Sequence, residues 1–437
     1  MQRFNIKKNI VYVLLEYFTK FFVSFFITLK VAKKLGVSNY GELNYFLSIA
    51  TIITIVSNFG IDGYLVSKLS IKETDFEKKQ LISSSILLNV VLYILIWSLF
   101  IMSAYFIGVE LRYMHLYLCA GYFFSIFKNF QYYFISKGDS YINSKYQLLS
   151  LLVSTVLKLI FLLFFDKLLD YITILAIIEI ISGTGYIFIY TKFYGGELIK
   201  GFSVKEMKCL IKDCLPLFIS VLSVNLYMRV DQIMLKAMLN SYELGIYSSV
   251  VKLTEIWYVI PAIIVPIFIP KISSNKENKI LYEKSIERLL ALLLFLAIIL
   301  VFPYILFPKA IMLISYGSSF IEGGSILKMY SILLIIMYLG SFRGKWMIIE
   351  GKQKYLMIFG ITGLIMNIIL NLILIPKYKS AGATIASIIS QVMTNYFLLF
   401  LFKDTRKMAI LESKAIVNVF NIKENMKLVL EKDKDED

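Results

Sequence analysis

The chain has 437 residues, of which 58% are hydrophobic and only 17% are charged. A soluble protein of this length carries far more surface charge, so these numbers exclude an ordinary soluble enzyme or binding module. The net charge is +16 at pH 7, and most of the basic residues lie in short gaps between apolar runs. This pattern is typical of membrane-surface charge, and we expect no nucleic-acid partner.

Apolar runs of about 18 to 25 residues recur along the chain, and this is the length that crosses a bilayer as an α-helix. The sequence therefore predicts an all-α integral membrane protein with about twelve transmembrane helices. Basic residues in the connections predict cytoplasmic N- and C-termini, with about 29 Lys and Arg residues inside and about nine outside. The predicted spans are residues 10–30, 43–64, 81–107, 113–135, 146–165, 171–191, 214–238, 246–269, 286–307, 325–349, 355–375 and 381–402.

The connections indicate how these spans are grouped. Long basic connections precede the seventh and ninth spans, and each contains a capping box, Ser203-Val-Lys-Glu206 and Ser274-Asn-Lys-Glu277. A short sequence similarity between residues 38–45 and 240–248 favours two halves related by duplication. Such a duplication is common in transporters. We predict an N-terminal six-helix bundle over 1–200, a C-terminal six-helix bundle over 201–402 and a charged cytoplasmic tail over 403–437.

Ionisable side chains inside membrane spans are costly and usually face the bundle interior or water. In span one, Glu16 and Lys20 are four residues apart, and span eight carries Lys252 and Glu255. Each pair can form its own ion pair, so a structural role and a ligand-binding role both stay open for these residues.

Lys128 in span four, Lys158 in span five and Arg229 in span seven have no acid on their own helix face. Arg343 in span ten lies towards the inner side of the membrane, as does Lys128. Because a cluster of cations around one cavity repels itself, it is expected to bind an anion. The sequence predicts a transporter with a cationic, polar central cavity.

Span seven contains the stretch NLYMRVDQIMLKAML, residues 225–239. Asn225, Arg229 and Gln232 follow the spacing that places side chains on one helix face, so this face is expected to be polar. Asp231 points away from Arg229 and should pair with a cation or a hydroxyl on an adjacent helix, in a structural role. The candidates for proton or sodium coupling are Glu16, Asp231 and Glu255. The candidates for substrate contact are Arg229, Lys158, Lys128, Lys20, Asn225, Gln232, Lys252 and Arg343.

Other chemistries find little support. The three cysteines form no CxxC pattern, and His115 is the single histidine, so we expect no metal site. No GxxxxGK[ST] pattern occurs, so the chain has no visible ATPase of its own. We expect no cofactor and no catalytic residues.

Three stretches carry a family resemblance: KLGVSNYGELNYF, NLYMRVDQIML and LGIYSSVVKLTEIWYVIPAIIVPIFIPKIS. With the twelve spans, they resemble the Wzx-type oligosaccharide repeat-unit flippases of the MOP exporter superfamily. The resemblance implies two six-helix bundles in a MATE-like V around a basic lumen. It also implies movement of an undecaprenyl-diphosphate-linked oligosaccharide from the inner to the outer leaflet of the bacterial cytoplasmic membrane, for O-antigen, lipopolysaccharide or capsule synthesis.

By the same resemblance, Arg229, Lys158, Lys128 and Lys20 hold the diphosphate and any acidic sugars, while the prenyl tail stays in membrane lipid. A polysaccharide polymerase and a chain-length regulator are the implied protein partners. Two other classes remain open. A MATE-like cation-coupled multidrug exporter shares the architecture but is expected to use acidic cavity residues. A membrane glycosyltransferase or polymerase is expected to have a large outer loop, whereas the outer connections here are short.

Overall fold

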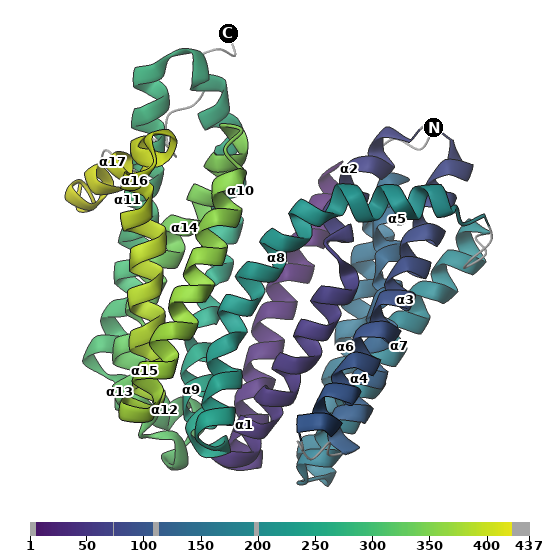
Figure 1. Cartoon of the computed structure of the whole chain (residues 1–437), viewed down its shortest axis with the longest axis horizontal. Helices are drawn as coiled ribbons and strands as arrows, with labels where there is room; N and C mark the ends of the chain where they lie inside the picture. The colour runs from purple at the N-terminus through teal and green to yellow at the C-terminus, as the bar shows by residue number, and fades with distance from the viewer. Residues whose placement is uncertain (1–5, 73, 108–112, 196–200, 422–437) are drawn as a thin grey trace. The chain divides into compact units, whose positions relative to one another are not determined.

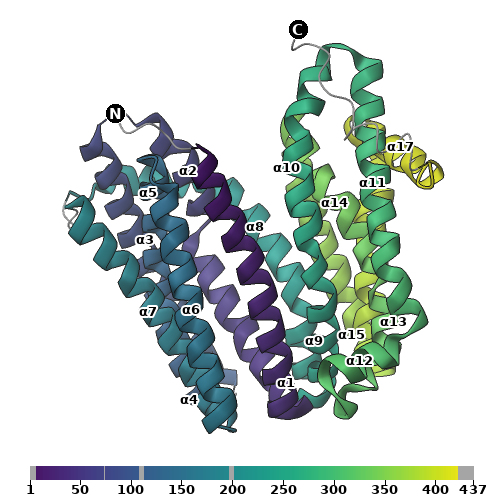
Figure 2. The same cartoon turned by 180° about the vertical axis from the view of Figure 1, so that it is seen from behind.

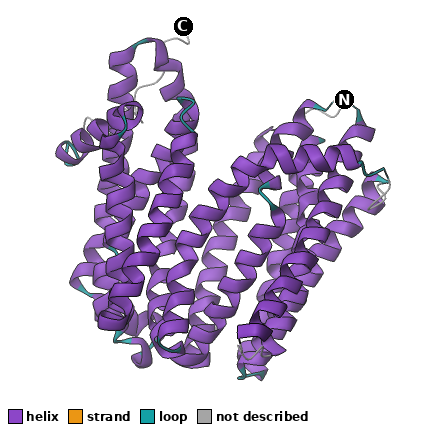
Figure 3. Ribbon diagram, viewed as in Figure 1, coloured by secondary structure: helices purple, strands orange, loops and turns teal. Residues whose placement is uncertain are grey.

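The computed structural model describes residues 6–72, 74–107, 113–195 and 201–421, and the side chains of residues 6–22 lie outside that description. Every regular element in this part of the chain is a helix, as Figure 3 shows. The prediction of an all-α protein is confirmed. The chain forms two compact units, Met1–Arg229 and Val230–Asp437.

The first unit is a bundle of long apolar helices (Figure 1 and Figure 2). Its first element contains two helices that meet at a kink at Gly36, where φ is 74°. In this unit α1 packs on α3 and α6, and α4 packs on α7. The elements are α1(Ile6–Asn58), α2(Ile61–Ile71), α3(Asp75–Ile107), α4(Tyr113–Phe123), the 3₁₀ helix η1(Phe124–Asn129), α5(Phe130–Ser136), α6(Ser140–Phe164), α7(Leu168–Tyr194) and most of α8(Val204–Met238).

The second unit begins within α8. In this unit α9 packs on α13, and α11 packs on both α14 and α17. A kink at Lys379 joins two helices within α15. The elements are α9(Ser241–Glu255), η2(Ile256–Tyr258), α10(Val259–Ser274), η3(Asn275–Glu277), α11(Lys279–Leu306), α12(Pro308–Tyr316), η4(Ser318–Phe320), α13(Gly323–Tyr330), α14(Ile332–Ile349), α15(Lys354–Val392), the π-helix η5(Met393–Phe397), α16(Leu398–Leu401) and α17(Lys403–Val417).

Each of the twelve predicted spans coincides, to within one residue at its end, with a helix or a run of helices. Within the described residues, eight helical segments are long and apolar enough to cross a membrane, or nine when the bent α8 is included. The segments Val23–Ile71 and Lys354–Leu401 are the longest, and each takes in more than one predicted span. The protein is therefore a multi-pass membrane protein, as its apolar runs predict.

The helices of the first unit bury one face and expose another apolar face. Leu65, Ile82, Phe130 and Tyr190 belong to one fully buried cluster that joins α2, α3, α5 and α7. On α6, the outward face is apolar and exposed, at Leu149, Leu152, Val156 and Leu163. Exposed apolar faces of this size are expected where a helix contacts lipid.

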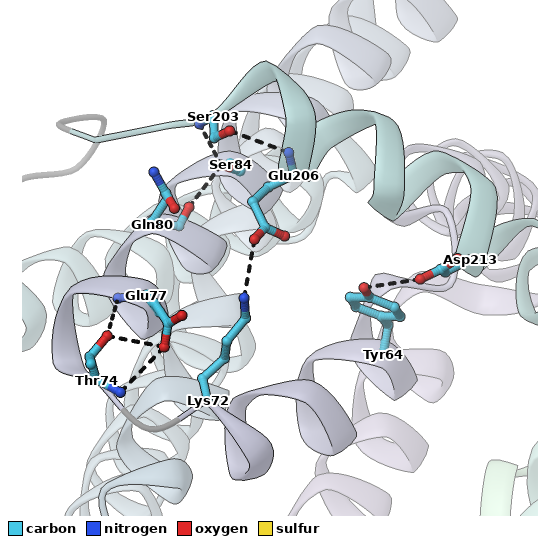
Figure 4. A network of polar contacts seen from close by, with 9 residues as sticks. All are labelled: Tyr64, Lys72, Thr74, Glu77, Gln80, Ser84, Ser203, Glu206 and Asp213. Carbon is cyan, nitrogen blue, oxygen red and sulfur yellow. Dashed lines mark hydrogen bonds and ion pairs between the residues drawn. The ribbon is translucent and has the colours of Figure 1, made fainter.

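Polar contacts tie the start of α8 to the first unit, as Figure 4 shows. Ser203 caps the helix, because its Oγ accepts a hydrogen bond from the Glu206 backbone N–H at 3.4 Å. The Ser203 backbone N–H donates to Ser84 Oγ on α3 at 3.0 Å. Lys72 donates to the Glu206 carboxylate at 3.1 Å. The serine half of the predicted capping box is confirmed.

The boundary between the units differs from the predicted one at residue 200. It falls at Arg229, inside α8, since the first part of this helix completes the core of the first unit. Leu210 and Cys214 are fully buried in that core, and Tyr64 donates to Asp213 at 3.2 Å. The described end of the basic connection before span seven, residues 201–213, is thus part of the first bundle.

The second predicted capping box is wrong. Ser274 is the last residue of α10, and Glu277 ends the short helix η3. The next helix, α11, is capped by Asn278, whose side chain accepts from the Leu281 backbone N–H at 3.2 Å. Asparagine is as good an N-cap as serine, and it lies closer to the apolar run.

The predicted charged tail also differs in part from the structure. Its first fifteen residues form α17, which packs on α11 and α16 and lies across them in Figure 1. Met408, Leu411 and Glu412 are buried in this contact. Residues 422–437 lie outside the described part of the chain.

A substitution at Gly60 tests the break between α1 and α2. Gly60 has a φ of 70°, and a Cβ there would lie 2.9 Å from the Phe218 backbone nitrogen. Gly60→Ala is expected to destabilise the protein by about 1–2 kcal/mol, because the left-handed conformation strains an L-residue. Gly63→Ala is the matched control, since a Cβ there makes only an ordinary contact at 3.8 Å. Thermal unfolding in detergent measures both, and equal melting temperatures would contradict the assigned strain.

Candidate functional site

The first unit contains a polar cavity of about 400 Å³, here called the basic cavity. Among the residues that the structure describes, the lining has two lysines and one glutamate, which is one positive charge in excess. Its walls are otherwise rich in hydroxyl and amide groups. The lining residues are Ser24, Tyr122, Lys128, Gln131, Tyr146, Gln147, Ser150, Leu151, Ser154, Lys158, Leu175, Ile178, Glu179, Ser182 and Tyr186.

One face of α6 supplies much of this lining. Gln147, Ser150, Ser154 and Lys158 recur at the spacing of a single helix face, opposite the exposed leucines. This polar face of α6 therefore faces the basic cavity. It places Lys158 in the same cavity as Lys128 and Glu179, among hydroxyl and amide groups.

Lys128 reaches the same cavity from the 3₁₀ helix η1. Its ammonium donates to Glu179 Oε2 on α7 at 2.6 Å. Residue spacing relates only acids on the same helix face and does not reveal this partner, which is 51 residues away. The available signal was Glu179 itself, a single acid within the apolar stretch 177–181. Lys128 is therefore a paired cation in this structure.

Arg229 interacts electrostatically with the hydroxyl of Tyr122, a residue of the cavity lining. The Arg229 side chain is half-buried. Its neighbour one turn earlier, Asn225, uses its amide to donate to the Val221 carbonyl at 2.8 Å. The structure thus brings Lys128, Lys158 and Arg229 into the same region of the first unit.

Asp231 is buried in the second unit and accepts three hydrogen bonds from neutral donors. The Tyr247 hydroxyl on α9 donates at 2.7 Å, and Asn371 Nδ2 on α15 donates at 2.6 Å. Ser387, also on α15, donates to the same carboxylate. The expectation that Asp231 finds a hydroxyl on an adjacent helix is confirmed.

Arg343 is not placed with the other predicted cations. Its guanidinium is buried in the second unit and forms a bidentate pair with Glu412 on α17, with Nε–Oε1 at 2.8 Å and Nη2–Oε2 at 3.1 Å. Its Nη1 donates to Asn395 Oδ1 at 2.8 Å. Burial raises the pKa of the Glu412 carboxyl, and the guanidinium beside it opposes that rise. All three donor groups of Arg343 thus serve the second unit's own packing.

The remaining candidates are dispersed. Gln232 is buried in the second unit. Lys252 and Glu255 are half-buried on α9, and within the described structure they form no ion pair with each other. Glu16 and Lys20 lie among the residues whose side chains are outside the description. Among the described residues there is no cluster of three or more histidine, cysteine and acidic side chains that could hold a metal ion.

Comparison with known proteins gives a family match and one curated relative. The family described as "Polysaccharide biosynthesis protein" matches residues 6–276. The capsular polysaccharide biosynthesis protein CapF of Staphylococcus aureus is 26% identical over 203 residues, which are 46% of this chain. The match spans 51% of CapF, about half of that protein's length.

Solved structures share the fold over nearly the whole chain. The lipid II flippase MurJ, in an inward closed conformation, superposes with a TM-score of 0.70 at 16% identity, covering 96% of this chain and 95% of MurJ. An inward-facing MATE multidrug resistance transporter of the MOP superfamily superposes with a TM-score of 0.65 at 16% identity, covering 93% of this chain and 99% of that protein. At this identity the likeness concerns the fold.

Proposed function

The chain belongs to the polysaccharide biosynthesis protein family, and we propose that it is a flippase for an undecaprenyl-diphosphate-linked oligosaccharide. In this proposal the protein lies in the bacterial cytoplasmic membrane with both termini in the cytoplasm. It moves one repeat unit from the inner to the outer leaflet by alternating access, for the synthesis of capsule or O-antigen. A polysaccharide polymerase and a chain-length regulator are proposed to act on the product.

The observation that carries this proposal is the basic cavity inside a membrane-embedded unit. An excess positive charge in a low-dielectric site is costly unless an anion compensates it. Lys158 and Lys128 can supply that attraction to a diphosphate, and the nearby Arg229 adds a guanidinium, which suits paired phosphate oxygens. The serine, glutamine and tyrosine side chains of the walls match the hydroxyls of a glycan.

The charge of the described cavity lining also supports one of the two transporter classes that share this fold. A site for cationic drugs is expected to carry negative charge, because opposite charges attract in a low-dielectric site. The basic cavity has the opposite sign, with Lys128 and Lys158 against Glu179. This supports the glycolipid substrate over a multidrug substrate.

Proton or sodium coupling is part of the proposal. Of the predicted candidates, Asp231 already accepts hydrogen bonds from three neutral donors. Glu255 is half-buried on α9 and has no ion pair within the described structure. Of these two carboxylates of the second unit, Glu255 is therefore the better candidate for binding the coupling ion.

Complementation of a flippase-deficient strain tests the function. Lys158→Ala and Arg229→Ala are each expected to reduce surface polysaccharide about tenfold or more, because each removes a charged hydrogen bond to the substrate. Lys145→Ala is the matched control, since Lys145 is an exposed lysine on the same helix as Lys158 and lines neither cavity of this unit. Membrane levels of each variant are measured by immunoblot.

Full surface polysaccharide with either cavity variant, at wild-type membrane levels, would remove that residue from the site. Arg229→Lys separates charge from geometry: rescue by lysine means that positive charge suffices. Failure of the wild-type chain to restore polysaccharide in any strain that lacks a flippase of this family would contradict the proposed function itself.

A further inference from the structure

A second cavity of about 260 Å³ adjoins the basic cavity in the first unit and is here called the acidic cavity. Its charged residues within the described part of the chain are Asp62, Glu179 and Lys128, which leaves one negative charge in excess. The two cavities share four residues, including the Lys128–Glu179 ion pair. The acidic cavity is lined by Thr54, Asn58, Asp62, Asn89, Tyr93, Tyr122, Ser125, Ile126, Lys128, Asn129, Gln131 and Glu179.

The break between α1 and α2 places Asp62 in this cavity. α1 ends at Asn58, and Phe59 and Gly60 both have positive φ, so the helix restarts as α2 at Ile61. Asp62 lies in the first turn of α2, where the helix dipole stabilises a carboxylate. The carboxyl end of α1, which carries the opposite partial charge, also contributes to the cavity lining.

The Asp62 carboxylate is held by neutral groups. Asn58 Nδ2 donates to Asp62 Oδ2 at 2.5 Å, and the Tyr132 hydroxyl lies within hydrogen-bonding reach. No lysine or arginine side chain in the described part of the chain forms an ion pair with Asp62. A carboxylate in a membrane-embedded site is costly without a compensating positive charge.

The side-chain oxygen of a neighbouring amide, Asn89, also lacks a partner in the described structure. Asn89 Nδ2 donates to Asn58 Oδ1 at 3.2 Å, but Asn89 Oδ1 is buried and has no hydrogen-bond partner among the described residues. Buried oxygens of this kind are normally satisfied, so Asn89 Oδ1 can accept a hydrogen bond or coordinate a cation. Asn129 Nδ2 is likewise unpartnered and, as a donor, suits a water molecule of a hydrated ion.

We propose that the acidic cavity binds a monovalent cation, with the Asp62 carboxylate and the Asn89 amide oxygen as protein ligands. Carboxylate and amide oxygens are the ligands that hard cations prefer. The break in the membrane helix brings the carbonyl end of α1 to the same place, which is how discontinuous transporter helices hold sodium.

The shared ion pair links this cation to the basic cavity. Lys128 lines both cavities, and its ammonium is 2.6 Å from Glu179. A cation beside Asp62 and Glu179 compensates their charge and repels the Lys128 ammonium, which then turns towards the basic cavity. Cation binding and anion binding therefore strengthen each other, and the coupling is reciprocal. This second step rests on the proposed function, whereas the cation site itself does not.

Equilibrium binding of radioactive sodium to the purified full-length protein tests the cation site. Asp62→Asn is expected to lose one bound ion per chain relative to the wild type, and Asn89→Leu is expected to weaken the same site. Ser57→Ala is the matched control and should bind as the wild type does. Ser57 is also buried on α1, but its hydroxyl donates to the Ile53 carbonyl and lines neither cavity.

Circular dichroism and the melting temperature establish that each variant is folded. Folded Asp62→Asn that keeps the wild-type number of bound ions would overturn the site, as would sodium binding that is undetectable in the wild type at any pH. Should Asp62→Asn fail to fold, the binding isotherm of folded Asn89→Leu decides, because unchanged sodium affinity there would contradict the proposed ligand.

The link to the substrate site is tested with bare undecaprenyl diphosphate as the probe. Sodium, compared with choline at equal ionic strength, is expected to raise its affinity about tenfold in the wild type and not in Asp62→Asn. Glu179→Gln should bind the probe tightly without sodium, since Lys128 is then released permanently. Sodium-independent binding in the wild type would contradict the link. A wild type that binds sodium but not the probe would instead contradict the proposed substrate.

Discussion

Arg343→Ala is expected to destabilise the second unit by about 3–5 kcal/mol, the cost of leaving a buried charge without its partner. The Arg343 guanidinium and the Glu412 carboxylate are both almost completely inaccessible, with exposed side-chain fractions of 4% and 0%. Removing the arginine leaves Glu412 and Asn395 without their charged donor. Thermal unfolding in detergent and the amount of protein in the membrane measure the effect.

A double replacement is the control for this prediction. Arg343→Met combined with Glu412→Leu removes both charges and keeps apolar volume, so it is expected to be much less destabilising than the single change. A double variant as unstable as Arg343→Ala would show that the loss comes from packing. An unaltered melting temperature for Arg343→Ala would contradict the structural role and restore Arg343 to the list of substrate contacts.

The destabilisation by Arg343→Ala is expected to shrink at acidic pH. Burial raises the pKa of Glu412 in the folded state, and without the guanidinium nothing lowers it again. Between the ordinary glutamate pKa of about 4.3 and the raised pKa of the folded variant, Glu412 is protonated in the folded state and ionised in the unfolded chain. Its stability therefore falls as pH rises between the two pKa values and is greatest below the lower one.

Replacement of Asp231 is expected to have the second large effect. Asp231→Leu removes the carboxylate acceptor of the Tyr247 hydroxyl, the Asn371 amide and the Ser387 hydroxyl. A buried donor left unsatisfied costs about 1–3 kcal/mol. We expect a total loss of about 3 kcal/mol or more, seen as a lower melting temperature and reduced membrane levels. Tyr247→Phe removes a single donor from the same carboxylate and should cost much less.

Asp231→Asn separates a structural role from an ion-coupling role. Asparagine keeps one acceptor oxygen, so we expect mild destabilisation and unchanged dependence of transport on sodium or protons. A variant that folds like the wild type but transports without the normal ion dependence would show that Asp231 couples ions. The measurement is transport in proteoliposomes under imposed sodium and proton gradients.

The sequence predicts the helices of this protein well because each membrane span is a long apolar run. It could not predict the breaks. The turn at Phe59 and Gly60 and the 3₁₀ segment that carries Lys128 interrupt apolar runs without a proline. Phe59 instead stacks on Phe218 at 4.5 Å between ring centroids. Such local departures are set by packing against distant helices, which periodicity does not contain.

The charged partners show the same limit. Sequence spacing can suggest pairs only within one helix, and the one it suggests for Lys252 and Glu255 is not formed in the described structure. Glu179, in contrast, is 51 residues from Lys128, and Glu412 is 69 residues from Arg343. Glu412 lies in a segment whose sequence is typical of a charged tail. Its burial could not be predicted, because it depends on the packing of α17 against α11. The polar face of α6, in contrast, could be predicted, since a regular helix fixes which side chains point together.

The position of the unit boundary inside α8 has a consequence for producing the two units as separate polypeptides. A cut at residue 200 takes Leu210 and Cys214 from the interior of the first fragment. A cut after Met238 restores them but takes Asp231 from Tyr247, Asn371 and Ser387 in the second fragment. Neither cut yields two complete interiors, so co-expressed fragments should accumulate only when α8 is supplied to both.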